Sequence, residues 1–420
     1  MQDVRCALSI AADPPLDLTY ADVPPFAWVP AAPDPDGPGC PEALRSRILI
    51  DVVHDGAYIP PSFVAGLDRK RIGAAFVRER DWGASAIAHD LAAALHVDGF
   101  ARVDIARVLL DFNRFPGITT PFADHMNRFA INQPFASRLT HQDKRRILAD
   151  YYDPTSHAYE AALDGKLIKV AIHTYDEHNR TQTRRPAVSI LTRSHGHSRD
   201  HAIPVGLFDP LFPSELVELT CDPILRSRVA LTLEEAAVHV ADNYPYSLPE
   251  GSVEVRSQVW YFFSHVRRHY DAEHPRTPEE EADPTSPRNL VWSMLLDTNL
   301  RSAESDLLRS YLHMFRRPPE RWRDRFEAAR TEYEHVASFI DANRERLVEQ
   351  YKDGLDRPSS IVIEVRKDLV YDFAEGRPIG PRRDDIRRLG RLLAKAVHTY
   401  LVTDRALKEE GLANRDPRFS

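Results

Sequence analysis

Cysteine is scarce in this sequence of 420 residues, and the three cysteines form no pattern. Cys6, Cys40 and Cys221 are widely spaced, odd in number and without a CxxC pair, which argues against a disulfide framework and a thiolate zinc site. A reducing cytoplasm is therefore the expected location. The sequence also lacks an initial basic segment followed by a long apolar core, and no apolar run reaches the length of a bilayer. We expect neither export nor a membrane partner.

An excess of positive charge is also missing. The 55 lysine and arginine residues are outnumbered by 63 acidic residues, which gives a formal net charge of -8. This balance offers no electrostatic footprint for nucleic acid or for an anionic membrane. The sequence contains no phosphate-binding loop of the GxxxxGK[ST] or GxGxxG type. We therefore expect a small-molecule substrate and no nucleic-acid partner, and the sequence leaves a homo-oligomer open.

From residue 47 onward, apolar runs typical of strands alternate with helical segments. The strand candidates are "RILIDVV", "FARVDIARVLLDFN", "KLIKVAIHTYDEHN", "RPAVSILTR" and "SSIVIEVRKDLVYD". Between and after them, helices are expected at about 82–95, 141–164 and 383–403. Such alternation is typical of α/β proteins, in which helices flank a mixed, largely parallel sheet.

Composition divides the chain into four parts. Residues 1–45 are rich in proline, which disfavours helix, and we expect an extended arm lying on the body. Residues 46–255 are the first part of the α/β catalytic core. Residues 256–355 carry apolar positions at helical spacing among many charges, which predicts a helical insertion. Residues 356–420 return to the core with its last strand and a C-terminal helix.

Polar side chains follow several of the predicted strands. In chain order, the polar candidates are His54, Glu79, Asp81, the segment Asp111–Arg114, His173 and Glu364. In open α/β sheets, ligands bind just outside the carboxyl ends of the strands. Two histidines and a carboxylate suit zinc, which in catalytic sites keeps one position open for water. Because the candidates lie on separate segments without an HExxH motif, the residues alone also allow polar side chains that simply end strands.

The order of the motifs resembles the N-formylglutamate amidohydrolase family. "VHDGAYIP" at 53–60 is similar to the family's PHSGxxxP, "DWGAS" at 81–85 to DWxVD, and "ARVLLDFNR" at 106–114 to SRYVxDLNR. "NYPY" at 243–246 matches NxPY, and "IEVRKDLVYD" at 363–372 is similar to IEVNRxLYxD. The resemblance covers about 47–401. It implies a phosphorylase/hydrolase-like, zinc exopeptidase-like fold with the helical region as an addition.

The resemblance also implies an active site. It implies Zn²⁺ held by His54, Asp81 and His173, with Glu79 as the rival carboxylate because it lies two residues from Asp81. Glu364 would be the general base that takes a proton from the activated water and passes it to the leaving amine. The implied reaction is hydrolysis of a linear amide C–N bond, as in an N-formylglutamate deformylase. The substrate would be an N-formyl or N-acyl amide of a small, amino-acid-like compound.

Further residues are expected to bind the substrate. Arg114 and Arg366 are candidates to hold a carboxylate with two parallel hydrogen bonds, and Arg114 also to stabilise charge during the reaction. Asn113 and Asn243 complete the set of substrate-binding candidates. His157 is expected on a helix face, in packing or behind the metal ligands. The histidines at 195, 197 and 201 are expected in a loop at the pocket mouth, with a second metal site as the alternative.

The sequence departs from the family pattern at several positions. Ser85 stands where the second acid of DWxVD is usual, and Arg366 and Lys367 stand in place of asparagine and arginine. N-formylglutamate itself is therefore not assured as the substrate. Two alternatives stay open. A set of two histidines and one carboxylate also binds Fe²⁺ in non-haem oxygenases, and the fold could serve a non-catalytic binding protein.

Overall fold

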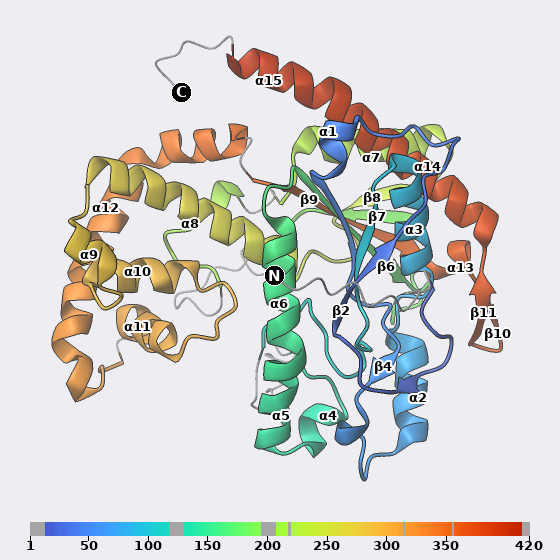
Figure 1. Ribbon diagram of the computed structural model, residues 1–420, viewed down its shortest axis with the longest axis horizontal. Helices are drawn as coiled ribbons and strands as arrows, with labels where there is room; N and C mark the ends of the chain where they lie inside the picture. The colour runs from blue at the N-terminus through green and yellow to red at the C-terminus, as the bar shows by residue number, and fades with distance from the viewer. Residues whose placement is uncertain are drawn as a thin grey trace.

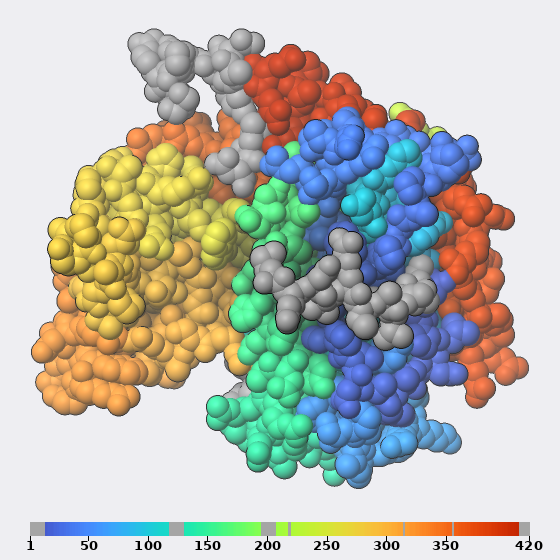
Figure 2. Space-filling view, in the orientation of Figure 1, coloured from blue at the N-terminus to red at the C-terminus, as the bar shows by residue number. Residues whose placement is uncertain are grey.

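A computed structural model describes residues 13–116, 130–194, 207–216, 220–314, 316–354 and 357–413. These residues form an α/β body with a central sheet, and a layer of helices beside it (Figure 1). Figure 2 shows this helical layer, in yellow and orange, next to the green helix α6 (Asp153–Leu163). Among the described residues, no helix is both long enough and apolar enough to cross a membrane.

Within the described residues, seven strands form the central sheet in the order β2-β5-β3-β6-β9-β7-β8. Strands β5, β3, β6 and β9 are parallel, β2 and β7 are antiparallel to their neighbours β5 and β9, and β8 is parallel to β7. The bounds are β2 (Phe26–Pro30), β3 (Ile48–Val52), β5 (Gly99–Val103), β6 (Ile168–Tyr175), β7 (Val188–Leu191), β8 (Val240–Asp242) and β9 (Ser359–Arg366). The predicted α/β class with a mixed, mostly parallel sheet is confirmed.

Strand β3 illustrates why the apolar runs become central strands. Ile48, Ile50 and Val52 pack in one cluster with helices α3 (Ala84–Leu95) and α14 (Arg383–Thr399). Leu49 belongs to the cluster on the opposite face. Because successive side chains of a strand point to opposite faces, a run that is apolar at every position is buried only when helices cover both faces.

Shorter elements complete the body. The remaining helices are α1 (Glu42–Arg45), α2 (Arg69–Glu79), α4 (Phe135–Arg138), α5 (His141–Ile147), α7 (Pro223–Glu235), α13 (Lys367–Val370) and α15 (Arg405–Ala413). A π-helical segment joins α5 to α6, and another joins α14 to α15. Two small sheets pair β1 (Thr19–Tyr20) with β4 (Tyr58–Ile59), and β10 (Tyr371–Ala374) with β11 (Arg377–Pro381).

The helical layer consists of five helices within the described residues. They are α8 (Val253–Glu273), α9 (Pro278–Ala282), α10 (Pro287–Leu296), α11 (Ala303–Met314) and α12 (Arg323–Asp353). Their core contains Phe262, Trp292 and Phe326, and the same cluster includes Ala171 of β6 and Val362 of β9. The layer is therefore packed directly on the sheet.

Two segments differ from the strand pattern expected from the sequence. The proline-rich N-terminal segment contributes β2, which pairs with β5 and forms one edge of the sheet, where a proline is tolerated. The predicted strand "FARVDIARVLLDFN" ends at Val103, and turns follow. Gly56 lies so close to this point that a Cβ atom there would be 2.5 Å from the carbonyl oxygen of Asp104. This close approach places the end of β3 beside the segment that carries Arg107 and Asp111.

Candidate metal centre and catalytic pocket

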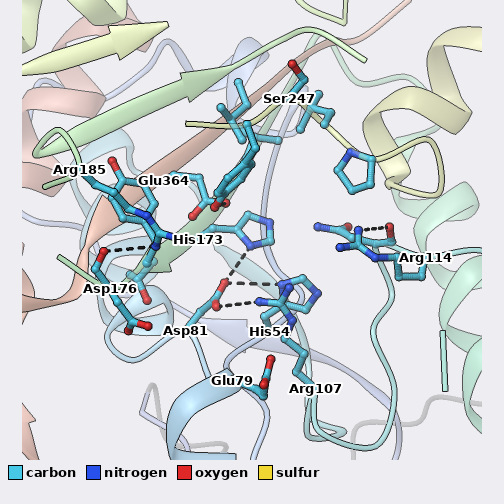
Figure 3. Close-up of a pocket in the computed structure, with 18 of the residues that line it drawn as sticks. His54, Glu79, Asp81, Arg107, Arg114, His173, Asp176, Arg185, Ser247 and Glu364 are labelled. Atoms are coloured by element: carbon cyan, nitrogen blue, oxygen red, sulfur yellow. Dashed lines mark hydrogen bonds and ion pairs between the residues drawn. The ribbon is translucent and has the colours of Figure 1, made fainter. Parts of the chain in front are cut away.

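Three candidate ligands converge at the carboxyl ends of the parallel strands. His54 follows β3, His173 lies near the end of β6, and Asp81 lies between α2 and α3. One donor atom from each residue lies within 4.8 Å of the other two, and all three residues are buried. Asp81 Oδ2 is 2.8 Å from His173 Nδ1 and 3.6 Å from His54 Nδ1, as the dashed lines in Figure 3 show. The separate strands therefore bring two histidines and a carboxylate to one point.

The hydrogen bonding of His54 fits a metal ligand. Its Nε2 lies 2.9 Å from Asp111 Oδ1, whereas its Nδ1 is buried and has no hydrogen-bond partner among the described residues. Burial would raise the pKa of Asp111, but the charge of Arg107 holds it well below its usual value. The ionised Asp111 accepts the Nε2 proton and leaves the Nδ1 lone pair directed at Asp81. Histidines that bind metals are commonly oriented by a carboxylate in this way.

The charges of the buried groups favour binding of a cation among them. Burial opposes ionisation of Asp81, but the hydrogen bond to His173 and the nearby His54 lower its pKa below the usual value. Burial would likewise lower the pKa of His173, yet the hydrogen bond to Asp81 and the nearby Glu364 raise it to about 9. Without a metal, His173 therefore carries a proton at neutral pH. A divalent cation can replace this proton and balance the carboxylates.

Glu364 adjoins the three candidate ligands. It lies on β9, directly opposite His173 on β6 in the register of the two strands. Tyr246, in the loop after β8, donates a hydrogen bond of 2.7 Å to Glu364 Oε1. Burial is the main cause that raises the pKa of Glu364, and the nearby Asp81 adds to it. A carboxyl group with a raised pKa is suited to accept and return a proton.

Arg107 is a site residue to which the sequence assigned no role. Its NH1 lies 3.3 Å from Asp81 Oδ1, and its Nε lies 3.3 Å from Asp111 Oδ2. One guanidinium therefore braces both the candidate ligand Asp81 and the carboxylate that orients His54. Arg107 matches the arginine of the SRYVxDLNR pattern four residues before Asp111, and this match is the signal of its role in the sequence.

A pocket of about 610 Å³ opens above the three ligands. Figure 3 shows Arg114 on one side of the histidines and Arg185 on the other. Arg114 donates to the backbone carbonyl of Asn113 at 3.1 Å and makes no ion pair within the described ranges. Arg185 donates to the carbonyl of Asp176, and its buried Nε has no partner in the described part of the chain. Both guanidinium groups are thus available to an anion.

The other candidates occupy different surroundings. Glu79 lines the pocket, but its carboxylate lies 3.0 Å from Arg78 and outside the group of three. Arg366 is not among the described residues that line the pocket, and its guanidinium donates two hydrogen bonds to the carboxylate of Asp368. Asn243 is absent from the same lining and accepts hydrogen bonds from two backbone N–H groups of the 192–193 segment.

The structure does not place the remaining candidate histidines in the site. His157 is exposed on α6 and is not part of the pocket lining in the described residues. The histidines at 195, 197 and 201 lie outside the described residues.

Two of the departures from the family motifs contact each other in the folded chain. Asp55, where PHSG has serine, accepts hydrogen bonds from Arg80 Nε at 2.6 Å and from the backbone N–H of Ser85 at 2.9 Å. Ser85 stands where DWxVD has its second acid. The acid and the hydroxyl residue are therefore exchanged between two contacting positions. One carboxylate is kept beside the start of α3, where the helix dipole favours negative charge.

The chain matches one family of known proteins. The sequence model of the family described as N-formylglutamate amidohydrolase matches residues 46–278, more than half of the chain. Among solved structures, N-formylglutamate amidohydrolase from Ralstonia eutropha is 14% identical, with a TM-score of 0.46 and coverage of 91% of this chain and 100% of that one. A gene product of Agrobacterium tumefaciens is 15% identical, with a TM-score of 0.39 and coverage of 88% and 92%. No curated protein matches the chain significantly.

Proposed function

This chain belongs to the N-formylglutamate amidohydrolase family, and from that premise we propose that it is a metal-dependent amidohydrolase. The proposed reaction is hydrolysis of an N-formyl or N-acyl amide of a small, amino-acid-like substrate that bears a carboxylate. The observation that carries the proposal is the buried group of His54, Asp81 and His173, with Glu364 beside it. A proton-transferring carboxyl group next to candidate metal ligands is suited to metal-assisted amide hydrolysis.

We propose zinc as the metal. Two imidazoles and one carboxylate at the floor of a pocket form a ligand set that is common in catalytic zinc sites. The buried Nδ1 of His54, which has no other partner in the described residues, supports this assignment. When bound, zinc would polarise the amide carbonyl and lower the pKa of a water molecule to about 7.

The chain's own residues would move the proton and place the substrate. Glu364 would take a proton from the attacking water and deliver it to the amine nitrogen as the C–N bond breaks. Tyr246 would hold Oε1 of Glu364, so that the carboxyl group keeps one orientation during both transfers. Arg107 would keep Asp81 and Asp111 in place through its two contacts.

The carboxylate of the substrate would bind at the arginines of the pocket. Arg114, with Asn113 beside it, and Arg185 line the pocket and make no ion pair among the described residues. A guanidinium can hold a carboxylate through two parallel hydrogen bonds, which fixes the orientation as well as the position of the substrate.

The proposal is tested by following amine release from a panel of N-formyl and N-acetyl amino acids. The wild-type protein loaded with zinc should release amine, and Glu364→Gln should bind zinc equally but lose activity by at least about a hundredfold. A Glu364→Gln variant with wild-type activity would refute the role of Glu364. Bound iron with consumption of oxygen and no amine release would replace hydrolysis by oxygenase chemistry.

A further inference from the structure

We propose that a second pocket, between the α/β body and the helical layer, binds a small aromatic carboxylate. This pocket has a volume of about 700 Å³ and lies between α6, the first half of α8 and the segment after α10. None of its lining residues in the described ranges also lines the catalytic pocket. The proposal therefore concerns a separate site and does not depend on the proposed hydrolysis.

The buried guanidinium of Arg256 is the main support for this proposal. It lies on α8, is only 7% exposed and makes no ion pair within the described residues. Its NH1 donates to the side-chain oxygen of Asn299, and its guanidinium lies 5.9 Å from the ring centroid of Tyr152. Its Nε has no hydrogen-bond partner in the described part of the chain. A buried guanidinium without a counter-ion is costly, and an anionic ligand in the pocket would offset this cost.

Two more cations lie at the rim of this pocket. Arg47 and Lys166 donate only to backbone carbonyls, of Gly165 and Ser46 respectively, and neither has an ion-pair partner in the described ranges. Burial and the charge of Arg47 both lower the pKa of Lys166. The two like charges are therefore close enough to repel each other, and an anion between them would relieve this repulsion.

The acidic residues of the wall form no ion pair with these cations in the described part of the chain. Glu160 accepts a hydrogen bond of 3.0 Å from the side chain of Asn299. Asp297 accepts hydrogen bonds from the backbone N–H groups at 301 and 302, where it holds the turn before α11. Asp164 is exposed to solvent. Within the described residues, the guanidinium of Arg256 therefore has no carboxylate partner and is available to an anion.

Aromatic side chains also line this pocket. Trp260 and Tyr261 on α8 meet edge to face, with ring centroids 5.0 Å apart, and Trp260 is 42% exposed. Leu163 and Val253 extend the apolar surface. A ring of the ligand can pack on these side chains while its carboxylate pairs with Arg256. Aromatic surface combined with an unpaired, buried guanidinium is the reason for choosing an aromatic carboxylate.

The experiment compares 3-phenylpropionate with its neutral amide, 3-phenylpropanamide, by calorimetric titration of the full chain loaded with zinc. The acid should bind at least about tenfold more tightly than the amide, because only the acid forms charge-assisted hydrogen bonds. Arg256→Gln should abolish this preference. Arg267→Gln, on the same helix but outside the lining of this pocket, should retain it. Equal affinity for acid and amide would overturn the proposal.

Two further variants locate the binding. Because Arg114 in the catalytic pocket could also hold a carboxylate, Arg114→Gln should leave the affinity for 3-phenylpropionate unchanged. Loss of binding in Arg114→Gln would assign the ligand to the catalytic pocket and overturn the proposal. Trp260→Ala removes a half-exposed side chain that the fold can spare, and it should weaken binding of the acid by at least about fivefold. Wild-type affinity in Trp260→Ala would contradict the aromatic part of the site.

Discussion

Replacing Asp55 by serine restores the residue of the family motif and should nevertheless destabilise this chain. Asp55 and Arg80 are almost completely buried, with side chains 2% and 3% exposed, and their charged atoms are 2.6 Å apart. Asp55→Ser leaves the Arg80 guanidinium without a carboxylate, and removal of one partner from a buried ion pair costs about 3–5 kcal/mol. Arg80 keeps its hydrogen bond to the carbonyl of Pro15 and its contact with the Trp82 ring. We therefore expect Asp55→Ser to lower the free energy of unfolding by about 3 kcal/mol, at the lower end of that range.

The double variant Asp55→Ser/Ser85→Asp tests whether a carboxylate at position 85 can replace the carboxylate at position 55. Ser85→Asp alone places a second carboxylate beside Asp55 and should destabilise the chain by about 1 kcal/mol through repulsion. In the double variant, the new carboxylate adjoins Arg80 without that repulsion. Its loss of stability should therefore be at least about 1 kcal/mol smaller than the sum of the two single losses.

The assay is urea-induced unfolding of the metal-free protein, followed by circular dichroism. The midpoints of the variants are compared on the condition that the dependence of the unfolding free energy on urea concentration is unchanged. An Asp55→Ser variant within about 1 kcal/mol of the wild type would refute the importance of the buried pair. Additive losses in the double variant would show that positions 55 and 85 do not compensate each other.

Two further predictions concern the catalytic pocket. Arg185→Gln should raise KM at least about tenfold for substrates with a carboxylate but not for their amides, because a charge-assisted pair is lost; amine release measures both. Arg184→Gln is the matched control, since the side chain of Arg184 is 65% exposed. Equal effects of the two variants would contradict the role of Arg185. The affinity for Zn²⁺ should rise by up to about tenfold per pH unit and level off near pH 9, because the metal must displace the proton that the raised pKa of His173 retains below about 9. Competition titrations with a chelator between pH 6 and 10 measure this slope, and a flat profile below pH 9 would contradict the assignment of His173 as a ligand.

Local pattern was sufficient for the main strands of the sheet. The apolar residues of β3, β6 and β9 are buried on both faces, and their sequence runs carry this information directly. Pattern failed for β2, because the prolines around it disfavour regular structure; Pro30 within the strand is tolerated because β2 lies at the edge of the sheet. It also failed after Val103, where the strand ends beside Gly56, since this contact joins residues that are far apart in sequence.

The site was less visible in the sequence than the fold. His54, Asp81 and His173 come from three segments, and without the family resemblance no spacing rule joins them. The exchange of acid and serine between positions 55 and 85 looks like two unrelated departures until the contact between them is seen. Arg185 belongs to none of the quoted family motifs. Its availability depends on the absence of a carboxylate partner in the described residues, which is a property of the folded chain.

The central claim, a metal ion held by the buried histidines and Asp81, is tested most directly by elemental analysis of the purified protein. We expect about one zinc ion per chain in the wild type and its loss in His54→Ala. His157→Ala, which removes an exposed histidine on α6, should retain the metal and serves as the matched control. A wild-type protein without bound metal, or a His54→Ala variant that retains the full amount, would contradict the account.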